Sequence, residues 1–320
     1  MSQILRSGLL IIDKPAGVSS RDCLNQLQRI IGDRKFKLGH AGTLDPLATG
    51  VLIVAVGEAT RLVEQLHELD KQYSAEFEFG KSSDTLDREG EIVVHHDDPL
   101  PTREQLVEAG QRWTGLVMQQ PPRYSAIKVQ GRRAYELARR GNEFDLPERP
   151  VRIDRITVTR WDYPFWNIDI VCGSGTYVRS LGCDLAHTLG SHAIMTALLR
   201  TAVGPFSLAD AVALDDLTSL DDIAARLLSP LAGLPTWLVM ELDARQVQAI
   251  RHGRSILWHA DQVSRLGAGS QPCMAVDDQG QWVALLELLG NNHARPVRVF
   301  QTMMAISQPS TTKARHNPES

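Results

Sequence analysis

Cysteine is scarce in this chain of 320 residues. The four cysteines are spread widely and form no C-x-x-C pair: Cys23, Cys172, Cys183 and Cys273. This spacing excludes the usual zinc motifs and is too sparse for a disulfide framework, so it favours a reducing cytosol. The adjacent His95 and His96 would face opposite sides of a strand. We therefore predict loop histidines there and no metal site in the chain.

Long hydrophobic runs are also missing. No segment approaches the roughly 18 apolar residues that a membrane-spanning helix needs. The apolar run Leu9–Ile12 is too short for a signal peptide. With 43% hydrophobic and 22% charged residues, the composition is typical of a soluble globular protein of about two domains. We expect a cytoplasmic protein that does not contact a membrane.

Neither sign of charge dominates. The chain has 34 basic and 38 acidic residues, a net charge of −4, which excludes a uniformly basic nucleic-acid coat. Locally, Arg123–Arg160 holds ten basic and five acidic residues, whereas Pro205–Asp243 holds one basic and seven acidic. The first stretch could form a polyanion-binding face that the second would repel. The alternative is that both are ordinary solvated faces.

Hydrophobic periodicity and turn residues predict alternating short strands and helices without a regular βαβ rhythm, which favours an α+β fold. Strands are predicted over 8–13, 51–56, 73–79, 151–161, 166–172, 274–276 and 282–288. Helices are predicted over about 20–31, 60–69, 101–113, 134–140, 177–189 and 244–251. The sequence pattern changes at 229–235. The short strands that follow are separated by glycines and predict a small β-barrel.

The most unusual segment is the loop Gly39–Gly50, GHAGTLDPLATG, which runs straight into an uncharged strand. Asp45 is its one acidic residue. A partly desolvated carboxylate on a rigid loop can act as a nucleophile or a base. The alternative is an aspartate that only stabilises an Asp-Pro turn.

Two further segments could carry chemistry. Gly173–Arg179 is a strand-to-helix junction, but Val178 stands where a dinucleotide fingerprint needs a glycine. It is therefore either a ligand-facing junction or a capped helix with a surface arginine. Pro121–Lys128 interleaves aromatic and cationic side chains, as RNA-binding surfaces do, or forms a turn beside a solvated face.

In combination, six segments in order resemble the bacterial TruB family of tRNA pseudouridine synthases. They are GLLIIDKPAG (8–17), GHAGTLDPLATG (39–50), KQY (71–73), TLDREG (85–90), PRYSAIK (122–128) and GTYVR (175–179). The strong resemblance covers residues 8–204. Residues 238–303 are similar to the family's PUA-type RNA-binding domain, with weaker motifs.

This resemblance implies the pseudouridine-synthase fold: a central mixed, mainly antiparallel sheet flanked by helices, with a small C-terminal PUA-like β-barrel. It implies a catalytic domain over 1–237 and a PUA-like domain over 238–306. We expect the polar tail 307–320 to be disordered.

The resemblance also implies an isomerase that converts uridine 55 in the tRNA T-loop to pseudouridine. The N1–C1′ glycosidic bond is broken, the base rotates, and C5 is joined to C1′, with no cofactor. The uridine must be flipped out of the folded loop first. The expected partner is tRNA, through its T-stem-loop, and we expect a monomer without an obligatory protein partner.

By the same resemblance, Asp45 matches the catalytic aspartate. It adds to C1′ or C6, or takes the ribose 2′ proton, and the sequence leaves these routes open. Arg179 matches the arginine that pairs with this aspartate and keeps it ionised. Tyr73 matches the tyrosine that stacks on the target base. Tyr177 and Leu198 match pocket-lining positions.

Other matched positions concern the RNA. His40 matches the histidine that inserts where the base has left, and Lys14 matches a lysine near the active site for which we expect a structural role. Phosphate contacts are expected on the basic stretch that begins at Arg123, with Tyr124 and Lys128. In the C-terminal domain they are expected at Arg295 and Arg298. The chain departs from the family at Leu198-Leu199-Arg200, where a pair of arginines is expected.

Three rival functions remain open. A non-catalytic tRNA-binding or folding chaperone would not need Asp45, Tyr73 and Arg179 together. A retaining glycosidase would need a second carboxylate at the site, and the sequence shows none. RNA-guided archaeal and eukaryotic relatives carry accessory-protein surfaces and long basic extensions that this chain lacks.

Overall fold

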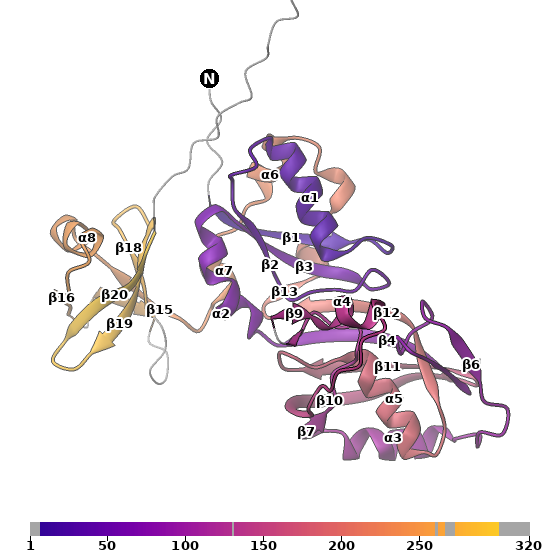
Figure 1. The fold of residues 1–320 in the computed structure, drawn as a ribbon. Helices are drawn as coiled ribbons and strands as arrows, with labels where there is room; N and C mark the ends of the chain where they lie inside the picture. Colours follow the sequence, from indigo (N-terminus) through magenta and orange to yellow (C-terminus); the bar gives the residue numbers. More distant parts are fainter. Residues whose placement is uncertain (1–6, 130, 260–261, 266–272, 301–320) are drawn as a thin grey trace, which may run out of the picture.

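Two sheets organise the computed structural model, which describes residues 7–129, 131–259, 262–265 and 273–300 (Figure 1). The large sheet has ten strands in the order β14-β1-β3-β12-β4-β11-β10-β7, with β2 added to β3 and β13 to β12. Only the pairs β1–β14 and β3–β12 are parallel. The sheet is therefore mixed and mainly antiparallel, and helices flank it, so the predicted fold class is confirmed.

The strands of the large sheet are β1 (Gly8–Lys14), β2 (Leu38–Ala41), β3 (Thr49–Val56), β4 (Lys71–Phe79), β7 (Gly115–Gln119), β10 (Arg149–Asp162), β11 (Phe165–Cys172), β12 (Ala193–Val203), β13 (Phe206–Ser207) and β14 (Val212–Ala213). Two hairpins stand outside it: β5 (Lys81–Ser83) with β6 (Ile92–Val94), and β8 (Lys128–Val129) with β9 (Arg132–Arg133). The helices are α1 (Ser20–Ile31), α2 (Val63–His67), α3 (Arg103–Arg112), α4 (Ala134–Arg139), α5 (Val178–Thr188), α6 (Leu220–Arg226), α7 (Pro230–Gly233) and α8 (Ala244–Arg251).

β1 and β3 are almost wholly apolar because both of their faces are covered. Leu10 and Ile12 of β1 pack in one cluster with the apolar side of α1. Leu9 and Ile11 point the other way, into a cluster that also contains Trp237. Continuous apolar strands are expected where a sheet is buried on both sides.

The other half of the sheet is covered by α5 and α3. Phe77 of β4 stacks on the fully buried Trp166, with ring centroids 4.6 Å apart. α5 approaches so closely at Gly182 that a Cβ there would lie 1.9 Å from the Phe77 ring. This glycine lets α5 lie flat on β4, and it thereby sets the position of the helix that carries Arg179.

The sequence pattern missed several elements, including β2, β7 and α6, and it was wrong over another. β12 was not predicted, although it lies between β3 and β4 and joins the two halves of the large sheet. The helix predicted over 60–69 is a 3-10 turn, Gly57–Leu62, followed by the short α2. Apolar runs such as that of β12 fit a buried strand or a buried helix equally well, and only their partners decide.

Three of the seven acidic residues in Pro205–Asp243 cap the N-termini of helices. Asp210 and Asp222 each complete a capping box, with Ser207 and Ser219 respectively, and Asp243 caps the N-terminus of α8. Side chains that accept hydrogen bonds from the first backbone amides of a helix stabilise it. These aspartates therefore have a structural role, which the sequence analysis did not identify.

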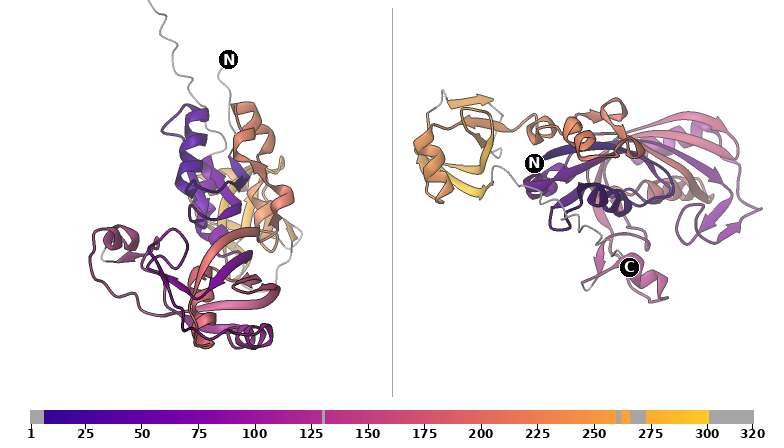
Figure 2. Two further views of the ribbon diagram at one scale, coloured as in Figure 1. Left: turned by 90° about the vertical axis from the view of Figure 1, so that its right-hand side faces the viewer. Right: turned by 90° about the horizontal axis from the view of Figure 1, so that it is seen from above.

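The second sheet has six strands in the order β16-β20-β19-β18-β15-β17. They are β15 (Leu238–Glu241), β16 (Ile256–Leu257), β17 (Val263–Arg265), β18 (Cys273–Val276), β19 (Trp282–Leu289) and β20 (His293–Val299). Figure 2 shows this sheet at one end of the molecule, beside the large sheet. The two units meet at an apolar cluster that includes Leu66, Trp237 and Phe300.

The curled second sheet agrees with the predicted PUA-like domain. The division at residue 237 stays a prediction, and the predicted tail 307–320 lies outside the described residues. None of the helices that the structure describes is long and apolar enough to cross a membrane.

Candidate active site

The loop that carries Asp45 is fixed from both sides. The buried hydroxyl of Ser20 accepts a hydrogen bond from the Leu44 backbone N–H (2.8 Å) and donates to the Leu44 carbonyl (3.0 Å). The Gly17 N–H donates to the Pro46 carbonyl (2.9 Å). The residues on both sides of Asp45 are therefore held in place by hydrogen bonds. The Asp45 side chain itself is 38% exposed.

Arg179 is the partner of Asp45. Its Nη2 lies 3.0 Å from Asp45 Oδ2, although its own side chain is only 5% exposed. The same guanidinium donates to the Thr85 carbonyl (2.5 Å) and the Tyr124 carbonyl (2.9 Å). The fork geometry of arginine allows these directed contacts at once. The predicted Asp45–Arg179 pair is therefore present in the structure.

A second carboxylate, which the sequence analysis missed, shares this arginine. Asp87 Oδ2 lies 3.4 Å from Arg179 Nη1, and its side chain is 5% exposed. Its other oxygen accepts hydrogen bonds from the Thr85 hydroxyl (2.6 Å) and the Glu89 N–H (3.0 Å). Asp87 is therefore buried and fully engaged. The expectation of a single carboxylate was wrong, but Asp45 is the member of the pair that solvent reaches.

Two of the predicted pocket residues, Tyr73 and Leu198, lie on neighbouring strands. Tyr73 of β4 pairs in register with Arg200 of β12, and Leu198 pairs with Ala75. Burial raises the pKa of the Tyr73 phenol, against an opposing effect of the Arg200 charge. Tyr177 immediately precedes α5, and the Arg149 guanidinium lies over its ring at 5.1 Å.

Two buried cations brace the site instead of facing it. Lys14 is fully buried and donates to the carbonyls of Pro15 (2.8 Å) and Val18 (2.6 Å). This placement fits the structural role expected of Lys14 and not a contact with substrate. Arg200, 1% exposed, donates to the carbonyls of Val51 (2.7 Å) and Gly42 (3.1 Å). The one arginine that remains of the expected pair is therefore a core contact.

The residues predicted for phosphate contact lie on a projecting segment. Arg123 and Lys128 are exposed, and the Arg123 guanidinium donates to the Asn142 carbonyl (2.9 Å). β8, β9 and α4 stand out from the body of the large sheet (Figure 2). Tyr124 links this segment to the site, because its carbonyl accepts from Arg179.

Gln119 is a second residue that sequence reasoning missed. Its side chain is almost fully buried at the end of β7, with 1% exposure. Its amide group holds the Tyr177 backbone twice, accepting from the N–H (2.8 Å) and donating to the carbonyl (3.1 Å). Because Tyr177 immediately precedes α5, the helix that carries Arg179, Gln119 helps to set the position of that arginine.

We expect Gln119→Leu to lower kcat about tenfold and stability by about 2 kcal/mol. The leucine would leave the Tyr177 N–H without its partner, at a penalty of about 1–3 kcal/mol for an unpaired group, whereas the Tyr177 carbonyl would still accept from the Leu181 N–H (3.0 Å). Gln120→Leu, a change at an exposed neighbour, is the control. Steady-state kinetics and urea unfolding give both numbers. Wild-type values for Gln119→Leu would remove its positioning role.

His40 is half-buried on β2, beside Val54 of β3. Burial lowers its pKa to about 4, and the charges of Arg21 and Arg200 act in the same direction. The imidazole is thus neutral at physiological pH. A neutral ring suits insertion among bases better than contact with a phosphate.

This shift predicts how stability responds to acid. An unfolded histidine titrates near 6.5, so between about pH 6.5 and 4 the unfolded chain binds the proton more readily than the folded one. Acidification through this window therefore destabilises the fold. We expect the Tm of His40→Gln to fall about 2–4 °C less than that of wild type between pH 7 and pH 5. His96→Gln, at an exposed histidine, should track wild type.

The chain is similar to known proteins in sequence and in fold. Residues 28–178 match the model of the TruB family pseudouridylate synthase (N terminal domain). The chain is 40% identical over 303 residues to the tRNA pseudouridine synthase B of Syntrophobacter fumaroxidans, covering 92% of this chain and 98% of that protein. It is 42% identical over 303 residues to the protein of the same name from Caulobacter vibrioides, covering 92% and 96%.

Among solved structures, the chain is similar to one chain of a Cbf5-Nop10-Gar1 complex. The TM-score is 0.69 at 22% identity, over 93% of this chain and 85% of that one. A chain of an archaeal box H/ACA sRNP Nop10-Cbf5 complex gives 0.67 at 22% identity, over 95% and 88%. At this identity the likeness concerns the fold.

Proposed function

The chain belongs to the TruB family of pseudouridylate synthases, and on this premise we propose how its residues isomerise a uridine of tRNA. The substrate is uridine 55 of the T-loop. The reaction breaks the N1–C1′ bond and rejoins the base through C5. One observation carries the assignment of the site: Arg179 holds two carboxylates, and only that of Asp45 reaches solvent.

We propose that Asp45 is the group that reacts. It adds to C1′ or C6 of the flipped nucleotide, or it takes the 2′ proton. Each of these routes begins from a carboxylate anion held at one place, and the pinned loop and Arg179 supply that placement. Each route also ends with loss of the proton from C5.

The neighbouring side chains receive the flipped base. With its raised pKa, the Tyr73 phenol stays protonated at neutral pH and can lie against the uracil ring. Leu198 is 8% exposed on the adjacent strand and offers an apolar contact. Stacking and apolar contacts of this kind offset the unstacking that base flipping requires. Tyr177 completes the set, and His40 takes the place that the base leaves in the RNA.

We propose that the basic stretch that begins at Arg123 binds the phosphate backbone of the tRNA. Arg123 and Lys128 are exposed, and Lys128 begins the β8–β9 hairpin, so phosphates can reach both residues. We propose that the protein acts on tRNA as a monomer in the cytoplasm, where tRNA is modified, and that it needs no protein partner or organic cofactor for this step.

The C-terminal sheet adds a second RNA contact in this proposal. Arg298 is half-buried and its guanidinium donates to the Arg61 carbonyl of the catalytic body, so the more exposed Arg295 gives the cleaner test of this contact. Arg295 is exposed beside Glu287, with a contact of 2.6 Å. We expect Arg295→Ala to raise the KM for whole tRNA about threefold and to make the salt slope shallower by about 0.7–0.9. An isolated T-stem-loop, measured in parallel, should be unaffected. An equal loss with both RNAs would place Arg295 elsewhere.

The position of the product tests the function. Unmodified tRNA is incubated with the protein, treated with a carbodiimide that marks pseudouridine, and copied by reverse transcriptase. We expect one new stop, one nucleotide 3′ of uridine 55, and none when that position is cytidine. A protein that speeds tRNA folding without any new stop would be a chaperone, and the proposal would fail.

A further inference from the structure

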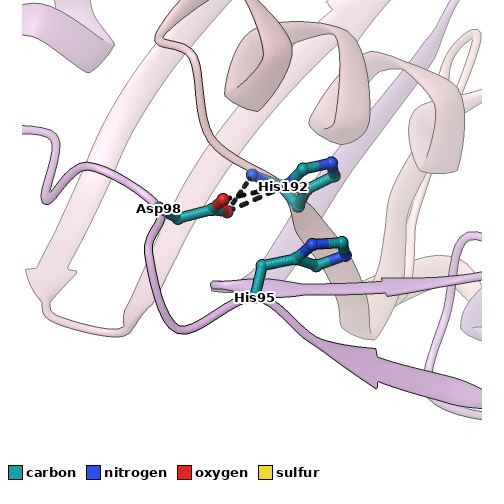
Figure 3. A group of neighbouring side chains, drawn as sticks. All are labelled: His95, Asp98 and His192. Carbon is teal, nitrogen blue, oxygen red and sulfur yellow. Dashed lines mark hydrogen bonds and ion pairs between the residues drawn. The ribbon is translucent and has the colours of Figure 1, made fainter.

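Three side chains of metal-ligand type meet outside the active site, at the base of the β5–β6 hairpin (Figure 3). His95 follows β6, Asp98 lies three residues further on, and His192 immediately precedes β12. One ligand atom from each residue lies within 4.8 Å of the others. All three residues are partly buried. The group was invisible in the sequence, because 94 positions separate Asp98 from His192.

Backbone hydrogen bonds hold the two segments together at Gly80. The Gly80 N–H donates to the His192 carbonyl (2.9 Å), and the Gly80 carbonyl accepts from the His95 N–H (2.8 Å). The backbones of both histidines are therefore anchored to one residue, Gly80. Their proximity is built into the fold and does not depend on long, freely rotating side chains.

Asp98 is preorganised beside His192. Its carboxylate accepts from the His192 N–H (2.7 Å) and the Ser191 hydroxyl (3.2 Å), and it lies 3.0 Å from His192 Nδ1. Two donors thus keep this carboxylate pointing at the imidazole (Figure 3). A carboxylate next to an imidazole recurs in and around the ligand sets of zinc and related ions.

The two imidazoles lie face to face. Their centroids are 3.6 Å apart and their planes differ by 8°. The Ser82 hydroxyl lies 2.7 Å from His95 Nε2, and the His187 ring meets His192 edge-on at 5.5 Å. This contact brings a ring nitrogen of each histidine and a carboxylate oxygen of Asp98 within 4.8 Å of one another.

We propose that His95, Asp98 and His192 bind one divalent transition-metal ion of the zinc class. Imidazole nitrogen with a carboxylate oxygen is a ligand set that such ions prefer, whereas magnesium and calcium prefer oxygen alone. A fourth position is left for water. The ion would brace the base of the hairpin whose far loop carries Asp87, and it takes no part in the chemistry of uridine.

Binding requires one local movement. In tetrahedral zinc, bonds of about 2.0–2.1 Å place neighbouring ligand atoms about 3.3 Å apart, which is closer than the 4.8 Å limit of the present arrangement. In addition, the lone pairs of two stacked imidazoles lie in parallel planes, so they do not converge on one ion. The His95 ring therefore turns out of the stack, exchanging its contact with Ser82 for the metal. His95 is the ring that can move, because the His192 backbone N–H holds Asp98 beside its own ring, and His192 Nδ1 would exchange its contact with that carboxylate for the metal.

Zinc titration of the chelator-treated, full-length protein tests this site. By calorimetry we expect one Zn²⁺ per chain with a Kd of about 1–10 µM, and with Co²⁺ we expect the intense visible bands of a tetrahedral complex. His95→Ala and His192→Ala should each weaken binding at least about tenfold, or roughly 1.4 kcal/mol. His96→Ala removes an adjacent, exposed histidine and should bind as wild type does.

Two results would overturn the proposal: no saturable binding up to about 100 µM Zn²⁺, or equal affinities in His95→Ala and His96→Ala. Circular dichroism without metal shows whether each variant is folded. Should His192→Ala not fold, His95→Ala and the isosteric Asp98→Asn decide the question, because neither replaces a side chain of the apolar core. Magnesium at the same concentrations should give no heat.

Discussion

Asp45→Asn should abolish pseudouridine formation and leave tRNA binding within about threefold of wild type. Asparagine keeps the shape of the side chain on its pinned loop, but it cannot act as a nucleophile or a base. We expect kcat to fall at least about a thousandfold, which corresponds to roughly 4 kcal/mol of lost transition-state stabilisation. Single-turnover kinetics with enzyme in excess over RNA, together with filter binding, separate the two effects.

The control for charge is Asp13→Asn. Asp13 is an exposed carboxylate at the end of β1, so its removal changes the net charge by the same amount without touching Arg179. This variant should keep wild-type turnover. Residual activity of Asp45→Asn above a few per cent of wild type would deny Asp45 the central role.

Arg179→Ala should cost both activity and stability. It removes the one cation shared by Asp45 and the buried Asp87. Breaking a buried ion pair by removing one partner typically destabilises a protein by about 3–5 kcal/mol, because a charge is left uncompensated. We expect kcat to fall at least about a hundredfold, measured at a temperature where circular dichroism shows the variant folded.

Arg179→Lys refines this prediction. A single ammonium cannot reproduce the fork that reaches Asp45, Asp87 and two carbonyls, so rescue should be partial. Arg88→Ala, at an exposed arginine of the neighbouring loop, should leave stability unchanged. A loss confined to tRNA affinity in Arg179→Ala would instead make this arginine a phosphate contact.

Local patterns predicted the parts of the fold that local chemistry determines. The apolar run of β1 and the capped helix α1, with Ser19 at its start and Gly32 at its end, could be predicted because propensity, capping and periodicity agree there. β12 could not be predicted, because its apolar run fits a buried helix as well as a strand. Only its pairing with β3 and β4 on either side makes it a strand.

The site divides in the same way. Asp45, Tyr73 and Arg179 were identified from motifs in order, and the structure brings Asp45 and Arg179 together. Asp87 and Gln119 were missed because their roles lie in contacts with segments about 60 to 90 positions away: Asp87 with Arg179, and Gln119 with Tyr177. No pattern within their own segments signals such contacts. For Lys14 the resemblance implied a structural role near the active site, and the fold buries this lysine fully.

Release of tritium from C5 tests the central claim most directly. A T-stem-loop RNA with [5-³H]uridine at the target position is mixed with excess protein, and tritium in water is followed with time. The account predicts release approaching one tritium per RNA with wild type and none above background with Asp45→Asn, although both proteins bind the RNA. Equal release by the two proteins, or none by wild type at saturating binding, would contradict it.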